Sequence, residues 1–315
     1  MDFLTSLVNS MPGAVAQGLI WGIMAIGVYI TYRILDVADL TVDGSLGTGG
    51  AVCVVLVLNG MPVGVALVAA TLAGMLAGLV TGLFHTACGI PAILAGILTQ
   101  LALYSVNLRI MGTGTGGGKA NLPISVDKYG LLVSARYVRN VALNNPILTL
   151  AIFCAVLIAV LYWFFGTELG CSLRATGANQ NMARAQGINT NVTKVLGLMI
   201  SNGLVALAGG LLAQYQGFSD INMGRGAIVI GLAAVIIGEV IFSRIFRNFA
   251  LKLLSAVIGA IIYYIVMVFV LRLGLSTDDL KLLTALVVAL FLTIPYWKGK
   301  YFTKTSVKKG EKNHA

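Results

Sequence analysis

The segment Gly166-Thr-Glu-Leu-Gly-Cys-Ser-Leu-Arg-Ala-Thr-Gly-Ala-Asn-Gln-Asn-Met-Ala-Arg-Ala-Gln-Gly-Ile-Asn189 is polar, rich in small residues and flanked by long apolar runs. Residues 172–186 contain good helix formers, and Gly187 is placed to end a helix. Three of its side chains fall near one another at helical spacing, namely Leu173, Met182 and Ala183. A membrane protein rarely needs a short water-exposed helix unless another protein acts on it. The segment therefore predicts one short helix that a partner binds.

The composition places the rest of the chain in a lipid bilayer. Of the 315 residues, 58% are hydrophobic and only 10% are charged, and the mean hydropathy is +0.93. A chain of this kind has too little polar surface for an ordinary soluble domain. A bilayer core about 30 Å thick needs roughly 17–25 apolar residues per helix. Such runs lie near residues 15–33, 62–84, 90–111, 147–165, 191–216, 227–242, 250–271 and 281–297, with a shorter, glycine-interrupted one near 45–58.

The sequence thus predicts an all-α polytopic membrane protein with about nine transmembrane segments in a single domain over residues 1–297. The basic tail over residues 298–315 indicates which way the chain is inserted, because loops rich in Lys and Arg stay in the cytoplasm. Counting spans backwards from a cytoplasmic tail places Arg244, Arg247 and the polar segment 166–190 on the cytoplasmic side. The net charge of +10 therefore reflects membrane topology rather than nucleic-acid binding.

Two faintly similar segments indicate an internal repeat. Residues 39–52 and 220–233 each follow one apolar run and open a glycine-rich one, so that Asp39 aligns with Asp220 and Gly50 with Gly231. The span count places the two aspartates on opposite sides of the membrane. This predicts inverted four-helix repeats joined by the helix near 147–165, an architecture that transporters use for alternating access.

Polar residues within or beside the apolar runs are candidates for a substrate path, because a charge at the bilayer centre costs on the order of 3 kcal/mol. Hydrogen bonding between helices is the alternative use of such residues. For Glu239, the alternatives are cytoplasmic water or a pair with Arg244. Asp43 is expected to cap the short span that it opens, and an exposed helix start can also hold a carboxylate. The candidates are Asp43, Ser45, Thr99, Asn107, Asn202, Gln214 and Glu239.

Signals for catalysis or cofactor binding are weak. The two histidines, His85 and His314, lie far apart in the sequence, and no catalytic triad or metal-binding motif accompanies them. The glycine-rich residues 112–120 miss the phosphate-loop pattern, because Thr113 and Ala120 occupy two of its required positions. We therefore expect residues 112–120 to form a flexible part of an outer loop over 112–146, no metal or cofactor bound by this chain, and no enzyme activity of its own.

Several segments together resemble one family, the permease subunits of ABC importers in the branched-chain amino acid and ribose class, and in particular the tryptophan/tyrosine type. They are residues 39–45, 78–85, 93–99, 103–112, 173–179, 182–189, 201–209 and 213–218. The resemblance covers about residues 15 to 240.

The resemblance implies that the helix over 171–187 is a coupling helix seated in a groove of a separate ATPase subunit, which binds ATP and magnesium. It also implies a second permease copy, a path between the two copies, an extracellular solute-binding protein, and a place in the plasma membrane of a prokaryote. Arg174 and Arg184 would make charged contacts with the ATPase, and Leu173 and Met182 would fill its groove. The full implied coupling set is Leu173, Arg174, Ala175, Gly177, Asn179, Met182, Ala183, Arg184 and Gly187.

The function expected from these features is that of a transmembrane subunit of an ATP-driven importer of amino acids, aromatic ones in particular. The alternative is an ion-coupled secondary carrier of small solutes in which Asp43 or Glu239 titrates. A membrane enzyme would need a reactive cluster of side chains that the sequence does not offer.

Overall fold

The computed structural model describes residues 2–113, 117–126, 128–138, 145–242, 245–246, 248–272 and 280–297. These residues form eleven α-helices, two short η helices and one two-stranded sheet. In chain order they are α1 (Asp2–Tyr29), η1 (Ile30–Ile34), α2 (Val42–Leu58), α3 (Val63–Thr86), α4 (Ala92–Met111), β1 (Asn121–Pro123), η2 (Ala135–Tyr137), α5 (Pro146–Gly166), α6 (Glu168–Ala178), α7 (Gln180–Ala185), α8 (Thr190–Gln216), β2 (Phe218–Asp220), α9 (Ala227–Phe242), α10 (Phe249–Arg272) and α11 (Leu280–Trp297).

Each apolar run expected from the sequence forms a helix, and six of the helices are long and apolar enough to cross a membrane. They lie within Val8–Ile34, Val63–Thr86, Ala92–Met111, Pro146–Gly166, Thr190–Gln216 and Phe249–Arg272. The chain is therefore a multi-pass membrane protein. Two further apolar helices, α2 and α9, have only 17 and 16 residues.

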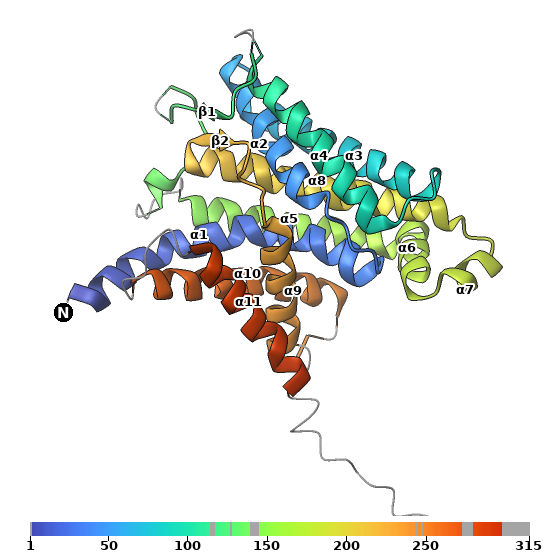
Figure 1. The fold of residues 1–315 in the computed structure, drawn as a ribbon. Coiled ribbons are helices and arrows are strands. Elements are labelled where there is room, and N and C mark those ends of the chain that lie inside the picture. The colour runs from blue at the N-terminus through green and yellow to red at the C-terminus, as the bar shows by residue number, and fades with distance from the viewer. Residues whose placement is uncertain are drawn as a thin grey trace, which may run out of the picture.

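Helix α8 is the centre of the packing, with α3 on one side and α1 on the other, and α10 lies beyond α1 (Figure 1). Glycines permit this close contact. A Cβ added at Gly74 or Gly78 of α3 would collide with the backbone carbonyl of Asn202 or Leu198 in α8. Small residues at such spacing allow membrane helices to approach one another and gain van der Waals contact.

Contacts along α8 give the direction of its neighbours. Ser45 and Cys53 of α2 meet Asn202 and Gln214 of α8, so α2 runs parallel to α8. Helix α3 runs the opposite way, because its last turn carries His85, whose ring lies 3.4 Å from the Lys194 amine near the start of α8. The helices α6 and α7 therefore lie at one end of the bundle and the β1–β2 sheet at the other (Figure 1).

The mostly helical fold carries one small sheet, which ties part of the loop 112–146 to the turn after α8. Asn121 of β1 is paired with Asp220 of β2 in antiparallel register. The Ile124 amide also donates to the Gly217 carbonyl at 2.9 Å. Strands of three residues carry no readable period in the sequence, and their partner lies far along the chain. Residues 114–116, 127 and 139–144 of this loop lie outside the described residues.

The polar segment 166–190 forms two helices, and the expectation of one helix over 172–186 was wrong. Asn179 has extended backbone angles of φ −160° and ψ 105°, which end α6. Its side-chain oxygen then accepts a hydrogen bond from the Met182 amide at 3.1 Å and so caps α7. Asparagine favours such capping over a helix interior. Gly187 ends α7 at φ +80°, as predicted.

Candidate coupling surface and polar cavity

The coupling segment, residues 166–190, turns one face inward. Leu173 is fully buried, and its side chain lies near Leu35 and Gly197. Leu173 therefore belongs to the interior and does not fill a groove of a partner, which corrects the expectation for this residue. Gly177 also faces inward, because an added Cβ would collide with the Ile34 carbonyl. Of the two apolar side chains expected to reach a partner, only Met182 is free to do so, at 62% exposed.

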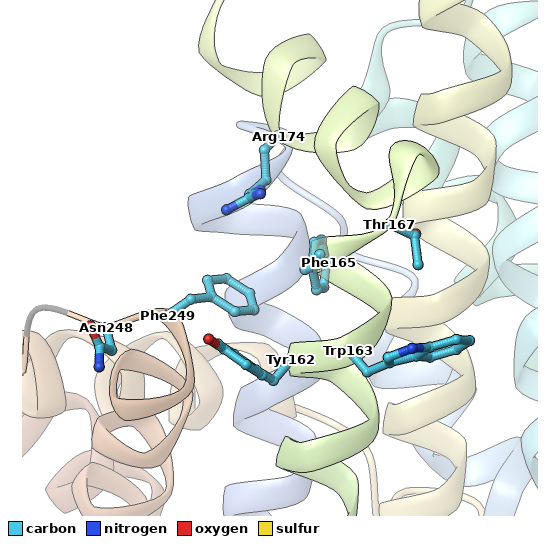
Figure 2. Close-up of a pocket in the computed structure, with 8 residues that line it drawn as sticks. Tyr162, Trp163, Phe165, Thr167, Arg174, Asn248 and Phe249 are labelled. Carbon is cyan, nitrogen blue, oxygen red and sulfur yellow. The ribbon is translucent and has the colours of Figure 1, made fainter.

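The two arginines of the coupling segment take different directions. Figure 2 shows Arg174 reaching from α6 toward α10, and its guanidinium carbon lies 5.9 Å from the centre of the Phe249 ring. Arg174 borders a cavity of about 580 Å³ whose walls include Tyr162 and Trp163 at the end of α5. Arg184 donates from Nε to the Thr190 hydroxyl at 2.8 Å and is otherwise exposed on α7.

Both helices of the segment carry outward-facing residues, and Arg174 of α6 and Arg184 of α7 are both exposed. Among the other implied coupling residues, Ala183 is buried, Ala175 is half-buried and Asn179 is exposed while capping α7.

Several of the polar residues proposed for a substrate path lie inside the helix packing. Ser45 donates to the Asn202 side-chain oxygen at 2.6 Å, and the Asn202 amide nitrogen donates to Asp39 at 2.6 Å. All three are buried. Because Asn202 lies near the middle of the 27-residue α8, this network holds the start of α2 at mid-height in the bundle.

Thr99 and Gln214 also make interior contacts. Thr81 donates to the Thr99 hydroxyl at 2.9 Å, and the Thr41 and Thr81 hydroxyls lie 2.7 Å apart. Gln214 accepts a hydrogen bond from the Leu132 amide at 3.2 Å. These contacts favour hydrogen bonding between elements as the role of Ser45, Thr99, Asn202 and Gln214.

Asp43 does not cap its own helix. Its carboxylate accepts hydrogen bonds from the amides of Gly226 and Ile228, both at 2.9 Å, at the start of α9. Its negative charge also suits the positive end of the α9 dipole. The expected cap on α2 is therefore replaced by a cap on α9, and the amino-terminal ends of the two short helices meet at Asp43.

A cavity of about 370 Å³ adjoins this meeting point, between α2, α4 and the turn before α9. Two predicted candidates line it, Asp43 and Asn107, and so do Gln100, Tyr104 and Arg225. The Arg225 guanidinium carbon lies 5.7 Å from the centre of the Tyr104 ring. The Asn107 side-chain oxygen is buried and has no hydrogen-bond partner among the described residues.

Sequence reasoning missed Arg225 and Tyr104 as site residues. Arg225 stands between Gly224 and Gly226 in one of the two repeat segments, so its position in a turn could have been a signal. Tyr104 looks like any other aromatic residue of an apolar helix.

Glu239 lies apart from this cavity. Its carboxylate pairs with Arg33 of η1 at 3.0 Å, and both side chains are partly exposed. Such pairs contribute little to stability in water. The alternative contact of Glu239 with Arg244 falls on a residue outside the described ones.

Comparison with known proteins identifies the family of this chain. Residues 11–294 match the sequence family of the permease component of branched-chain amino acid transport systems. The chain belongs to this permease family. The permease is 42% identical over 286 residues to the tyrosine transport system permease protein of Clostridioides difficile, a match that covers 90% of both chains.

Other relatives are more distant. An uncharacterized protein of Rickettsia prowazekii is 36% identical over 289 residues, covering 90% of this permease and 97% of that chain. The autoinducer 2 import system permease protein LsrC of Yersinia pseudotuberculosis is 30% identical over 208 residues, covering 63% of this chain and 54% of its own. Among solved structures, PsaBC from Streptococcus pneumoniae in complex with Fab matches with a TM-score of 0.49 and 17% identity, covering 95% and 96% of the two chains.

Proposed function

We propose that the permease is the membrane subunit of an ATP-driven importer of amino acids, with aromatic amino acids as its substrates. The observation that carries the proposal is the 42% identity, over 90% of both chains, to a tyrosine transport system permease protein. The polar cavity at the meeting of α2 and α9 supports it, because such a cavity gives a polar solute a place among apolar helices.

The energy would come from a separate ATPase subunit that binds ATP and magnesium. Its groove would receive the exposed face of α7, where Met182 and Arg184 project, as a helix bound in a groove. An extracellular solute-binding protein would deliver the amino acid at the end that carries β1 and β2. The coupling segment would face the cytoplasm, and so would the basic tail 298–315, which lies outside the described residues.

A second copy of the permease would complete the path. Helix α4 is largely uncovered by the rest of the chain, since only 22% of its most apolar stretch is buried. Three polar residues of this helix, Gln100, Tyr104 and Asn107, nevertheless line the polar cavity. Lipid is a poor neighbour for such groups, whereas a second copy facing α4 would enclose them with water and substrate.

An inverted repeat would supply the motion between outward and inward openings. The Asp39 carboxylate accepts from the Thr41 amide at 2.9 Å, and the Asp220 carboxylate accepts from the Asn222 amide at 2.7 Å. The same turn thus precedes α2 and α9, which run in opposite directions from Asp43. This likeness supports about nine membrane segments in which α2 and α9 are the short, broken members.

Reconstitution tests the proposal. The permease, its ATPase and its binding protein are placed in liposomes, and uptake of labelled L-tyrosine, L-tryptophan and L-leucine is measured with and without ATP. We expect uptake only with ATP. Substituting Met182→Asp should lower ATP-driven uptake at least about tenfold, because a charge would enter the apolar groove. Met61→Asp is the matched control, since Met61 is 49% exposed between α2 and α3 at the opposite end.

Two results would overturn the assignment. Uptake that needs no ATPase and collapses with a proton or sodium gradient would establish an ion-coupled carrier instead. Unchanged ATP-driven uptake by the Met182→Asp variant, with native folding and assembly, would remove α7 as the coupling element.

A further inference from the structure

The cavity beside α4 is lined by charged and polar groups from three parts of the chain. Arg225 and Asp43 both line it, yet the structure records no ion pair between them; among the described residues the recorded ion pair is that of Arg33 with Glu239. Asn107 adds an unpartnered acceptor that is only 2% exposed. Buried polar groups normally have partners, so the unpartnered Asn107 oxygen, in one cavity with the exposed Arg225, points to a ligand.

The chemistry of the Arg225 side chain determines which group of a ligand it would bind. A guanidinium is planar and always charged, and it binds carboxylates through two parallel hydrogen bonds. The Arg225 guanidinium carbon lies 5.7 Å from the centre of the Tyr104 ring, within the range of a cation–π contact that would help to hold the guanidinium at the cavity. Among the described residues, no ion pair of Arg225 with a carboxylate of the protein is recorded.

The other polar groups of the cavity are acceptors and suit a positively charged group of the ligand. Asp43 uses its two oxygens to cap α9, but a carboxylate has lone pairs for further donors. The Asn107 oxygen is a second acceptor on the neighbouring helix. An ammonium group carries three donors and would satisfy both acceptors.

The remaining walls are apolar. Leu101, Tyr104 and Ile221 contribute carbon surface, and Tyr104 is 41% exposed. A volume of about 370 Å³ lies at the lower end of the range for small-molecule sites, roughly 300–1,000 Å³. The cavity thus suits a compact solute with an apolar or aromatic side chain.

We propose that this cavity binds the head group of a zwitterionic α-amino acid, with Arg225 holding the carboxylate and Asp43 and Asn107 accepting from the ammonium. This rests on the proposed function and assigns the substrate class to a site in the permease itself, separate from the site on the binding protein. Tyr104 positions Arg225 and contacts the substrate side chain.

Thermal unfolding of the purified permease, without its binding protein, tests the site directly, because a ligand that binds only the folded state raises the melting temperature. The probes are L-phenylalanine, phenethylamine, which lacks the carboxylate, and 3-phenylpropanoate, which lacks the ammonium. We expect stabilisation by L-phenylalanine and little or none by the other two. Equal stabilisation by all three, or by none, would overturn the proposal without requiring any variant to fold.

Transport by the reconstituted complex provides the second readout. The binding protein is loaded with amino acid and added at a concentration that saturates the permease. Arg225→Gln should lower transport at least about tenfold, because a charged hydrogen bond is lost. Arg225→Lys should recover part of it. Arg109→Gln is the matched control, since Arg109 is exposed on the same helix as Tyr104 but does not line the cavity. Wild-type transport by Arg225→Gln would refute the site while leaving the importer intact, whereas no ATP-driven transport by the wild type would refute the proposed function.

Discussion

Asp43 joins two parts of the chain that lie far apart in the sequence. It sits in the first turn of α2, and both of its oxygens accept backbone hydrogen bonds from the first turn of α9. The amides at a helix start have no partner within the helix, so a carboxylate there gains hydrogen bonds and a favourable interaction with the helix dipole. One side chain thereby fixes the relative position of the two short helices.

Replacement of Asp43 by Asn tests this role. An amide has one acceptor oxygen and no charge, so we expect the free energy of unfolding to fall by about 1–3 kcal/mol. Thermal unfolding of the detergent-purified permease measures it as a lower melting temperature. Asp36→Asn is the control, because Asp36 is exposed and its φ of 53° suits asparagine. Equal melting temperatures of the two variants would contradict the capping role.

At the scale of the element, packing between α3 and α8 depends on small residues that let two backbones touch. Gly74 and Gly78 lie one turn apart on α3, and both face carbonyl groups of α8. Such helices have little hydrophobic drive to associate within lipid, so close van der Waals contact must stabilise them. The same closeness leaves no room for even a methyl group.

Gly78→Ala should therefore push α3 away from α8 and destabilise the permease by about 1–3 kcal/mol, the usual range for overpacking. Gly64→Ala is a matched control in the same helix, because no atom lies within 4 Å of a Cβ added there. Thermal unfolding should show a lower melting temperature for Gly78→Ala alone. An equal fall of the melting temperature in both variants would indicate that the loss of a glycine, rather than the loss of helix contact, lowers the stability.

At the scale of the whole molecule, the directions of the helices place both exposed cysteines at the same end of the bundle. Cys88 follows α3 and Cys171 lies in α6, both at the end of the bundle where α8 begins, whereas Cys53 and Cys154 are buried. The proposed orientation puts that end in the cytoplasm. The native cysteines thus report the sidedness of the permease.

A membrane-impermeant maleimide should leave the native permease unlabelled in intact cells. It should label Cys88 and Cys171 in inverted vesicles stripped of peripheral proteins. The variant Met61→Cys, at the opposite end, should be labelled in intact cells and serves as the positive control. Labelling of Cys88 or Cys171 from outside would reverse the topology and place the coupling segment on the wrong side for an ATPase.

The sequence by itself determined the membrane location, the helices around each apolar run and the polar segment 166–190 between two of them, because each depends on local composition and spacing. Its resemblance also identified the family. Only the tertiary structure decided that Leu173 faces inward, that Asp43 caps α9 and that Arg225 and Tyr104 join Asn107 around one cavity. In a membrane helix, positions that face lipid and positions that face the core are both apolar, so their pattern does not distinguish inside from outside. Contacts between residues as distant as 43 and 226 depend on how the whole chain folds back on itself, which no local pattern records.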